Sequence, residues 1–146
     1  MNAWSRTTRP VLSSLFATAV ISLATYSSFA IGQDVKVTLS GDQEVPPVQT
    51  AAKGSGTISV GADMSVSGSI TTTGVAGTMA HIHEAAPGKN GPPVVPLSKS
   101  GDATWSVPPG KKLTEAQYKS FKAGNLYVNV HSAAHAGGEI RGQIKP

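Results

Sequence analysis

The sequence predicts an all-β fold, an antiparallel Greek-key β-sandwich or barrel with one short helix. Apolar and polar residues alternate over short segments, which is the pattern of half-buried strands. The 16 glycines and 10 prolines fall largely between these segments, and one segment alone carries helix-capping signals. About seven or eight short strands in one domain are typical of a sandwich or barrel.

The first strand is predicted where Val35, Val37 and Leu39 alternate with polar residues, and Pro46-Pro47 exclude a regular central strand soon after it. The next two strands form a hairpin that turns near residues 61–63. The Gly- and Pro-rich stretch 85–96 is predicted to be a loop, with Val94-Val95 and Leu97 as an alternative start of a strand. The predicted strands cover residues 35–39, 58–60, 66–70, 78–84, 104–107, 125–131 and 139–145.

The one predicted helix begins at Thr114. Thr114 and Gln117 have the spacing of a capping box, and Leu113 and Tyr118 that of a hydrophobic staple. Gly124 fits the left-handed position that ends many helices. The helix is therefore expected to be short, about nine residues.

Residues 1–30 have the pattern of a secretory signal peptide, with cleavage after Ala30. Arg6 and Arg9 supply the positive start, 11–24 is largely apolar, and 28–30 is a small-x-small site. An uncleaved anchor is the alternative, but polar residues interrupt the apolar run, which is short for a membrane span. We expect a periplasmic or secreted protein whose residues 31–146 form one domain, with no membrane span after cleavage.

The mature part is weakly basic and contains no cysteine. Removing Arg6 and Arg9 leaves ten Lys and Arg against eight Asp and Glu, a formal charge of +2. The absence of cysteine excludes disulfides and thiolate ligands. The basic residues form no stripe with interleaved aromatics, so we expect no nucleic-acid partner. Nucleophile-elbow and phosphate-binding motifs are also missing.

All four histidines fall into two clusters, each at the end of a predicted strand. His81 and His83 are two residues apart, so their side chains share one face of a strand. His131 ends a later strand, and His135 lies in the glycine-rich loop after it. Imidazoles without thiolates suit copper, zinc or iron better than calcium or magnesium. The four histidines are therefore the predicted metal ligands, and a solvent-facing pair without a ligand role is the alternative.

Three neighbouring residues have two interpretations each. Met79 shares the face of His81 and His83 and could offer a thioether to Cu(I), but a methionine that fills a packing gap is the favoured interpretation. Glu84 and Glu139 either orient an imidazole or are ordinary solvated carboxylates.

A series of motifs in order resembles the CHRD domain, a family named after chordin and widespread in secreted bacterial proteins. The resemblance implies a fold and export but leaves the biochemical role open. It covers about residues 35–145 and rests on Leu39-x-Gly41-x-Gln43-Glu44-Val45-Pro46-Pro47, Ala80-His81-Ile82-His83, Gly91-Pro92-Pro93-Val94-Val95, 113–124, Leu126-Tyr127-Val128-Asn129-Val130-His131 and Gly138-Glu139-Ile140-Arg141-Gly142-Gln143.

A second resemblance is to the copper ligands of the copper-zinc superoxide dismutases, which are also Greek-key β-sandwiches. His81, His83 and His131 would take the places of copper ligands, and Arg141 that of the catalytic arginine that attracts superoxide. A cross-strand ion pair of Arg141 with Glu139 or another acid is the alternative. The chain departs from that family because it has no recognisable zinc loop, no bridging histidine between 83 and 131, and no cysteines. The resemblance therefore implies a copper-only site with His135 as fourth ligand.

Three hypotheses follow from these patterns. The first is a copper-dependent enzyme of superoxide-dismutase type, with a small anion such as superoxide as substrate. The second is a non-catalytic copper carrier or buffer built from the same residues and Met79. The third is a metal-free extracellular module that binds a protein or polymer. The sequence leaves open the native metal, catalysis against carriage, and the oligomeric state.

Overall fold

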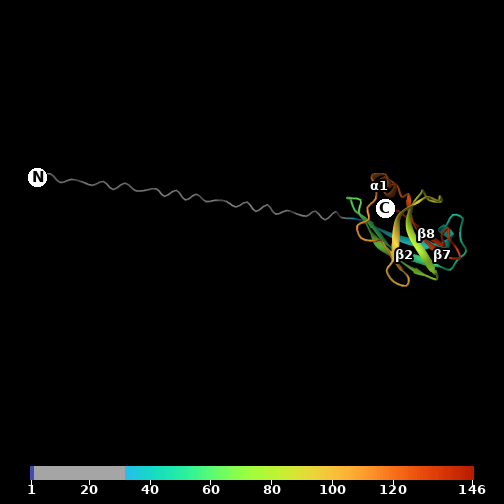
Figure 1. Ribbon diagram of the computed structural model, residues 1–146. Coiled ribbons are helices and arrows are strands. Elements are labelled where there is room, and N and C mark those ends of the chain that lie inside the picture. The colour runs from blue at the N-terminus through green and yellow to red at the C-terminus, as the bar shows by residue number, and fades with distance from the viewer. Residues whose placement is uncertain (2–31) are drawn as a thin grey trace.

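A computed structural model describes Met1 and residues 32–146 of the chain (Figure 1). The predicted signal peptide lies outside the described residues. Within the described part no helix has the length and hydropathy needed to span a bilayer. The described elements are β1 (Gln33–Ser40), a 3-10 turn η1 (Gly41–Gln43), β2 (Lys53–Val60), β3 (Val66–Thr73), β4 (Gly77–Glu84), β5 (Pro93–Lys99), β6 (Thr104–Ser106), α1 (Glu115–Lys122), β7 (Leu126–Ser132) and β8 (Ile140–Ile144).

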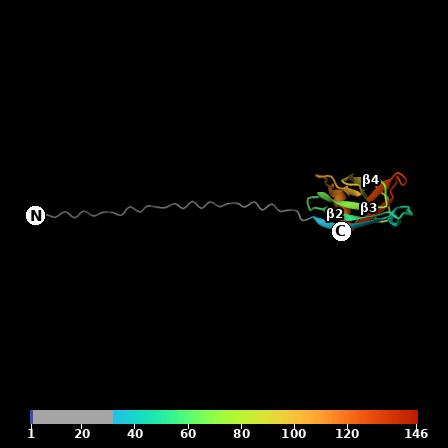
Figure 2. The ribbon, with the colours of Figure 1, turned by 90° about the horizontal axis from the view of Figure 1, so that it is seen from below.

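The strands close into an antiparallel barrel in the order β1-β2-β3-β6-β5-β4-β7-β8. The connection from β3 to β4 passes over β6 and β5, and the connection from β6 to β7 passes over β5 and β4. Such crossings define a Greek key, so the predicted all-β Greek-key fold is confirmed, in its barrel form. In this closed order β2 and β4 lie on opposite sides, as Figure 2 shows from below.

The interior is apolar because each strand directs alternate side chains inward. Val35, Val37 and Leu39 of β1 are 5%, 2% and 1% exposed, whereas the residues between them face solvent. The neighbouring strands β2 and β3 supply Ile58 and Ile70 to the same cluster, and the other strands add further aliphatic residues. Burial of each such side chain contributes roughly 1.5–3 kcal/mol. The alternation of apolar and polar residues in the sequence thus determines which face of each strand packs into the core.

The helix forms as its capping residues predict, and it has eight residues. Thr114 accepts from the backbone N–H of Gln117 at 3.2 Å, and the Gln117 side chain accepts from the backbone N–H of Thr114 at 2.9 Å. Gly124 follows the helix with φ of +74°. Such a conformation favours glycine because it has no Cβ.

One loop prediction is wrong in part. The loop after β4 ends at Pro92, and residues 93–96 belong to β5, where Pro96 pairs with His81 and Pro93 with His83. Proline cannot donate a ladder hydrogen bond, and the register shifts between Ile82 and His83. The predicted alternative, a strand that begins near Val94-Val95, is confirmed, and the barrel accommodates its prolines with this irregularity.

Candidate metal site

The outer faces of β7, of β8 at Arg141 and of β4 at His83 are buried, although an outer barrel face usually meets water. All seven residues of β7 are buried. Leu126, Val128 and Val130 point into the core, so Tyr127, Asn129 and His131 must be buried on the other side. The candidate site lies on this side, and three loops cover it.

The three loops are held by hydrogen bonds to one another and to the strands. Asn90 donates to the carbonyl of Val45 at 2.7 Å, which ties the loop after β4 to the loop after η1. Gln143 of β8 donates to the carbonyl of Ala85 at 3.1 Å. The third loop, 133–139, joins β7 to β8 and carries His135.

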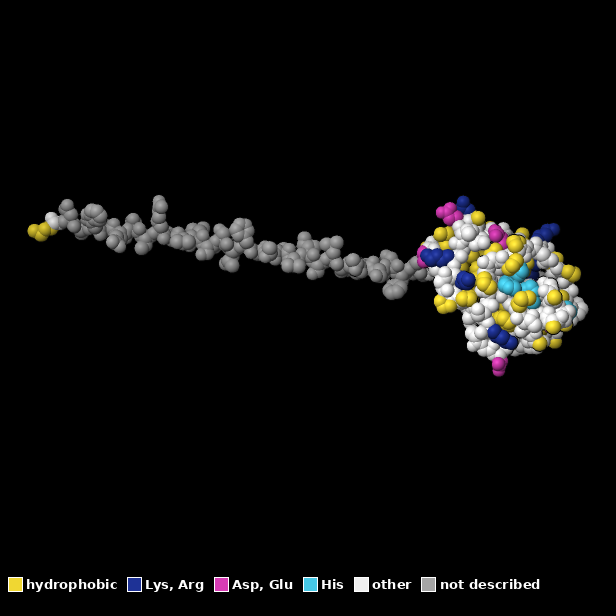
Figure 3. All heavy atoms as spheres, viewed as in Figure 1, with side chains coloured by type: hydrophobic (Ala, Val, Ile, Leu, Met, Phe, Trp, Pro, Cys, Tyr) yellow, Lys and Arg dark blue, Asp and Glu magenta, His cyan; other side chains and the backbone are white. Residues whose placement is uncertain are grey.

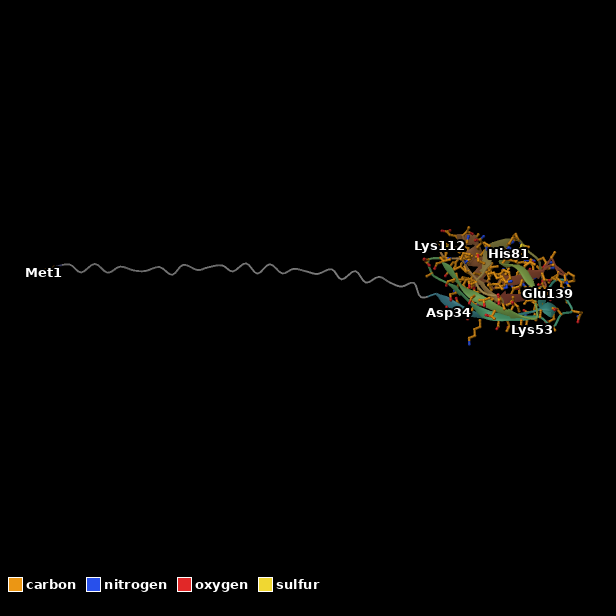
Figure 4. All side chains as sticks on the ribbon, turned by 60° about the horizontal axis from the view of Figure 1, so that its bottom comes forward. Met1, Asp34, Lys53, His81, Lys112 and Glu139 are labelled. Atoms are coloured by element: carbon orange, nitrogen blue, oxygen red, sulfur yellow. The ribbon has the colours of Figure 1, made fainter. Side chains whose placement is uncertain are left out.

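Three of the four predicted ligands come together on this face. His81 and His83 share the outer side of β4, and the register of β4 with β7 places His131 on the neighbouring strand. One ring nitrogen from each lies within 4.8 Å of the other two. Figure 3 shows histidine side chains in one patch bordered by hydrophobic ones, and Figure 4 labels His81.

His83 presents an unpaired nitrogen to this group. Its Nδ1 lies 3.0 Å from the carbonyl oxygen of Gly91, and a carbonyl only accepts, so Nδ1 carries the proton in the neutral ring. Nε2 therefore bears a lone pair. Among the described residues it is the one buried side-chain nitrogen or oxygen without a hydrogen-bond partner. Leaving such an atom unpaired costs about 1–3 kcal/mol, and a bound metal would satisfy it.

His131 is oriented in the same way by a different loop. Its Nδ1 donates to the carbonyl of Ala136 at 3.0 Å, which leaves Nε2 free to accept. The Nδ1 atom of His81 lies 3.2 Å from His131 Nε2. Metal-bound histidines usually donate a hydrogen bond from their second ring N–H to a carbonyl or carboxylate. The sequence interpretation assigned this orienting role to Glu84 or Glu139.

The two glutamates accept hydrogen bonds from hydroxyl groups rather than from an imidazole, so the interpretation that they orient an imidazole is wrong. Glu84 accepts from the hydroxyl of Ser120, and Glu139 accepts from that of Thr50 at 2.8 Å. The hydrogen bond from Ser132 is the main cause that lowers the pKa of Glu139, and Thr50 adds to it. The group of three thus contains imidazoles without a carboxylate.

The imidazoles favour their neutral form. Burial is the main cause that lowers the pKa of both His81 and His83 from the ordinary value of 6.5, and the charge of His131 acts in the same direction. The hydrogen bond to Gly91 acts the other way on His83. Metal ligation requires neutral imidazole, so these two rings need little deprotonation near pH 7.

The spacing of the nitrogens fits a transition metal closely. Two nitrogens that bind one ion at about 2.0–2.1 Å are at most about 4.2 Å apart. The observed spread of up to 4.8 Å therefore needs side-chain movements of about half an ångström. The donor type, the unpaired Nε2 of His83 and the spacing all fit an ion such as copper or zinc.

Arg141 lies beside the site, on the same outer face of the barrel, and is 1% exposed. Its guanidinium carbon is 3.5 Å from the centre of the Tyr127 ring, which stacks on His83 with centroids 5.0 Å apart and an angle of 17°. Arg141 donates to Asn90 Oδ1 and Gln143 Oε1, each at 3.3 Å. The arginine is thus separated from His83 by one aromatic ring.

Glu44 and Asn129 form a buried, hydrogen-bonded pair next to Arg141. Asn129 donates to Glu44 Oε1, and the two side chains are 2% and 6% exposed respectively. Burial raises the pKa of Glu44 to about 7, although the hydrogen bond from Asn129 and the charge of Arg141 oppose the shift. Sequence reasoning missed this pair and Tyr127. One sequence signal could have indicated it: the outward positions of the 125–131 strand, Tyr127, Asn129 and His131, include no Asp, Glu, Lys or Arg.

His135 and Met79 lie at the margins of the group. His135 is partly exposed and outside the set of three, and it lines a cleft of about 280 Å³ together with Glu44 and Gly138. Met79 is 51% exposed. The favoured interpretation of Met79 as a residue that fills a packing gap is therefore wrong, because a half-exposed side chain fills no gap.

Comparison with known proteins agrees with this architecture. The family model of the CHRD domain matches residues 35–144. The chain belongs to the CHRD domain family. CHRD domains occur in secreted and extracellular proteins. No curated protein and no solved structure matched the chain.

Proposed function

We propose that this CHRD domain is an exported copper-binding protein whose ligands are His81, His83 and His131. The observation that carries the proposal is the buried Nε2 of His83, which has no hydrogen-bond partner and lies among two other imidazoles. A metal-free interaction module gives no account of this atom. The predicted signal peptide and the family's occurrence in secreted proteins support export.

Copper is favoured over the other candidate ions by the donor set. Imidazole suits copper, zinc and iron, whereas calcium and magnesium need oxygen ligands. Copper(II) also binds a given nitrogen site more tightly than the other divalent first-row ions do. Zinc and iron are the comparison ions for any titration.

For His135, which lies outside this set of three, we propose a weaker, auxiliary role. It lies in the same loop as Ala136, whose carbonyl orients His131, and a change in that loop would bring it closer. Loss of His135 is therefore expected to weaken uptake less than loss of any of the other three histidines.

Superoxide dismutation is the second candidate function, and the position of Arg141 favours it. A permanent positive charge separated from His83 by one ring raises the local concentration of a small anion. Bound copper would supply the one-electron chemistry. Arg141 would act through its field, since its side chain is sealed from solvent. If the copper-loaded protein does not dismutate superoxide, the same site would serve to hold and deliver copper.

The experiment is a metal titration of the purified protein with Cu(II), Zn(II) and Fe(II). One equivalent of copper is expected to bind. His81→Ala is the most informative variant because His81 is partly exposed and orients no loop, so its loss should spare the fold, as thermal unfolding would check. Uptake should fall by roughly 100-fold. A wild-type protein that takes up no metal overturns the proposal, and a superoxide assay on the copper-loaded protein then separates enzyme from carrier.

A further inference from the structure

Met79 stands at the open end of the histidine group. Exposure rises along the outer side of β4, from 9% at His83 through the partly exposed His81 to 51% at Met79. Apart from Met1, no other large hydrophobic side chain in the described chain is exposed. The three residues alternate with Ala80 and Ile82, which point into the core, so they share one face.

The strand register places Met79 directly opposite His131. Directly opposed residues of an antiparallel pair have Cβ atoms about 4.5–5.5 Å apart on the same face. The thioether has three rotatable bonds between it and the backbone, so it can turn toward the imidazoles without any change in the strand. At the other end of the group the loop of Gly91 contacts His83, and the loop of Ala136 contacts His131.

We propose that the Met79 thioether is the fourth donor of the site and that the site takes Cu(I) in preference to Cu(II) and Zn(II). The inference rests on the proposed metal-binding function. Thioethers are soft ligands that select Cu(I). In addition, every donor is neutral, and the buried cation of Arg141 is separated from His83 only by the Tyr127 ring, so an ion of lower charge is repelled less.

The position of Met79 also gives the site an entrance. An exposed thioether beside partly exposed His81 is the first donor that an incoming ion meets, and buried His83 and His131 are the last. Cu(I) would therefore pass from solvent or a donor protein through Met79 to the imidazoles. A surface that exchanges Cu(I) with another thioether- or thiolate-bearing molecule fits this order.

The test compares four proteins in competition with a chromophoric Cu(I) chelator and, separately, with Cu(II) and Zn(II). Met79→Leu removes the sulfur and keeps a similar volume. Met64→Leu is the matched control, because Met64 packs against the core on another side of the barrel. His135→Ala tests the competing fourth ligand. X-ray absorption at the copper edge reports directly on a copper–sulfur contact.

Met79→Leu is expected to lower the Cu(I) affinity by about 10- to 100-fold and to leave the Cu(II) and Zn(II) affinities within about twofold. The copper–sulfur scattering of the wild-type protein should disappear in Met79→Leu and persist in Met64→Leu. Unchanged Cu(I) affinity in Met79→Leu, or an equal loss for all ions, overturns the inference while the proposed function stands. A loss of Cu(I) affinity in His135→Ala that is absent in Met79→Leu would also overturn it. Wild-type protein that binds no metal overturns both.

Discussion

The two outer faces of the barrel differ although their inner faces are built alike. On β1 and β2, outward side chains such as Asp34, Lys36 and Lys53 are exposed. On the far side, β7 is buried on both faces, and its outward residues meet three loops. Figure 4 shows Asp34 and Lys53 on the side of the barrel away from His81.

The comparison separates the strand faces that must be buried for the barrel to fold from those that need not be. One apolar face for each strand is enough to close the core, and β1 demonstrates this with its alternating pattern. The second buried face contains Tyr127, Asn129, His131 and Arg141, and burial of polar groups costs free energy unless they are paired. Most of these groups are paired, but Nε2 of His83 on the same face has no hydrogen-bond partner, and metal binding is the role that we propose for this face.

The largest expected contrast between the faces concerns their positive charges. Arg141→Ala removes a buried side chain that packs on Tyr127, and we expect a loss of about 3–5 kcal/mol in the free energy of unfolding. Lys36→Ala on β1 should change it by less than about 0.5 kcal/mol. Chemical denaturation measures both. Equal effects would mean that the covered face is no more tightly built than the exposed one.

Glu44 should make the covered face sensitive to pH. Its pKa is about 7 in the folded protein against an ordinary 4.5, so the folded state holds the extra proton between these values. Stability due to this group is fully present below pH 4.5 and falls as pH rises to about 7, by up to about 3 kcal/mol. The charged groups nearest to it are Arg141 on β8 and, in the same clefts, Asp42, His135 and Lys145.

Glu44→Gln isolates this effect because glutamine keeps an acceptor for Asn129 without a charge. Unfolding of both proteins is measured from pH 4 to pH 8. The variant should match the wild type at the acidic end and exceed its stability at the alkaline end. Histidine contributions cancel in the difference between the two proteins. A difference that does not vary with pH would contradict the raised pKa.

Two adjacent glycines test the loop that orients His131. Gly138 has φ of +131°, and a Cβ there would collide with Asn129 and Glu44. Gly138→Ala should cost about 1–3 kcal/mol and weaken copper uptake. Gly137→Ala is the control, since nothing lies within 4 Å of the corresponding Cβ. If both substitutions act alike, the loop does not support the site.

The smallest effect is expected at the exposed ion pair between Lys112 and Asp63. The two atoms are 3.2 Å apart, and the side chains are 59% and 48% exposed. Lys112→Ala should therefore cost at most about 0.5 kcal/mol, and salt should remove the difference. Denaturation at low and high ionic strength checks this. A loss above about 1 kcal/mol would show that charges outside the covered face also matter.

Much of the fold follows from local signals in the sequence. The capping box at Thr114, the glycine at 124 and the alternation of Val35, Val37 and Leu39 are each decided by neighbouring residues, and each is confirmed. The same alternation places His81 and His83 on one face. Residues 93–96 were left between loop and strand because their prolines argue against regular pairing, and β5 tolerates an irregular pairing there.

The environment of the site could not be read in this way. Alternation tells which side chains share a face, but it does not tell which loop covers that face. The carbonyls of Gly91 and Ala136 that orient two histidines, the sealed position of Arg141 and the exposure of Met79 all depend on contacts between distant segments. Backbone carbonyls leave no trace in a sequence pattern, since every residue has one.

The central claim is that the covered face holds a metal ion through three imidazoles. Long-range proton–nitrogen NMR of the histidine rings tests it most directly, with Zn(II) or Cu(I) as diamagnetic ions. Without metal, His83 and His131 should carry their protons on Nδ1. One equivalent should shift a ring nitrogen of His81, His83 and His131 together, while both Nδ1 protons persist. Ring nitrogens that do not respond to stoichiometric metal, or a response confined to His135, would contradict the account.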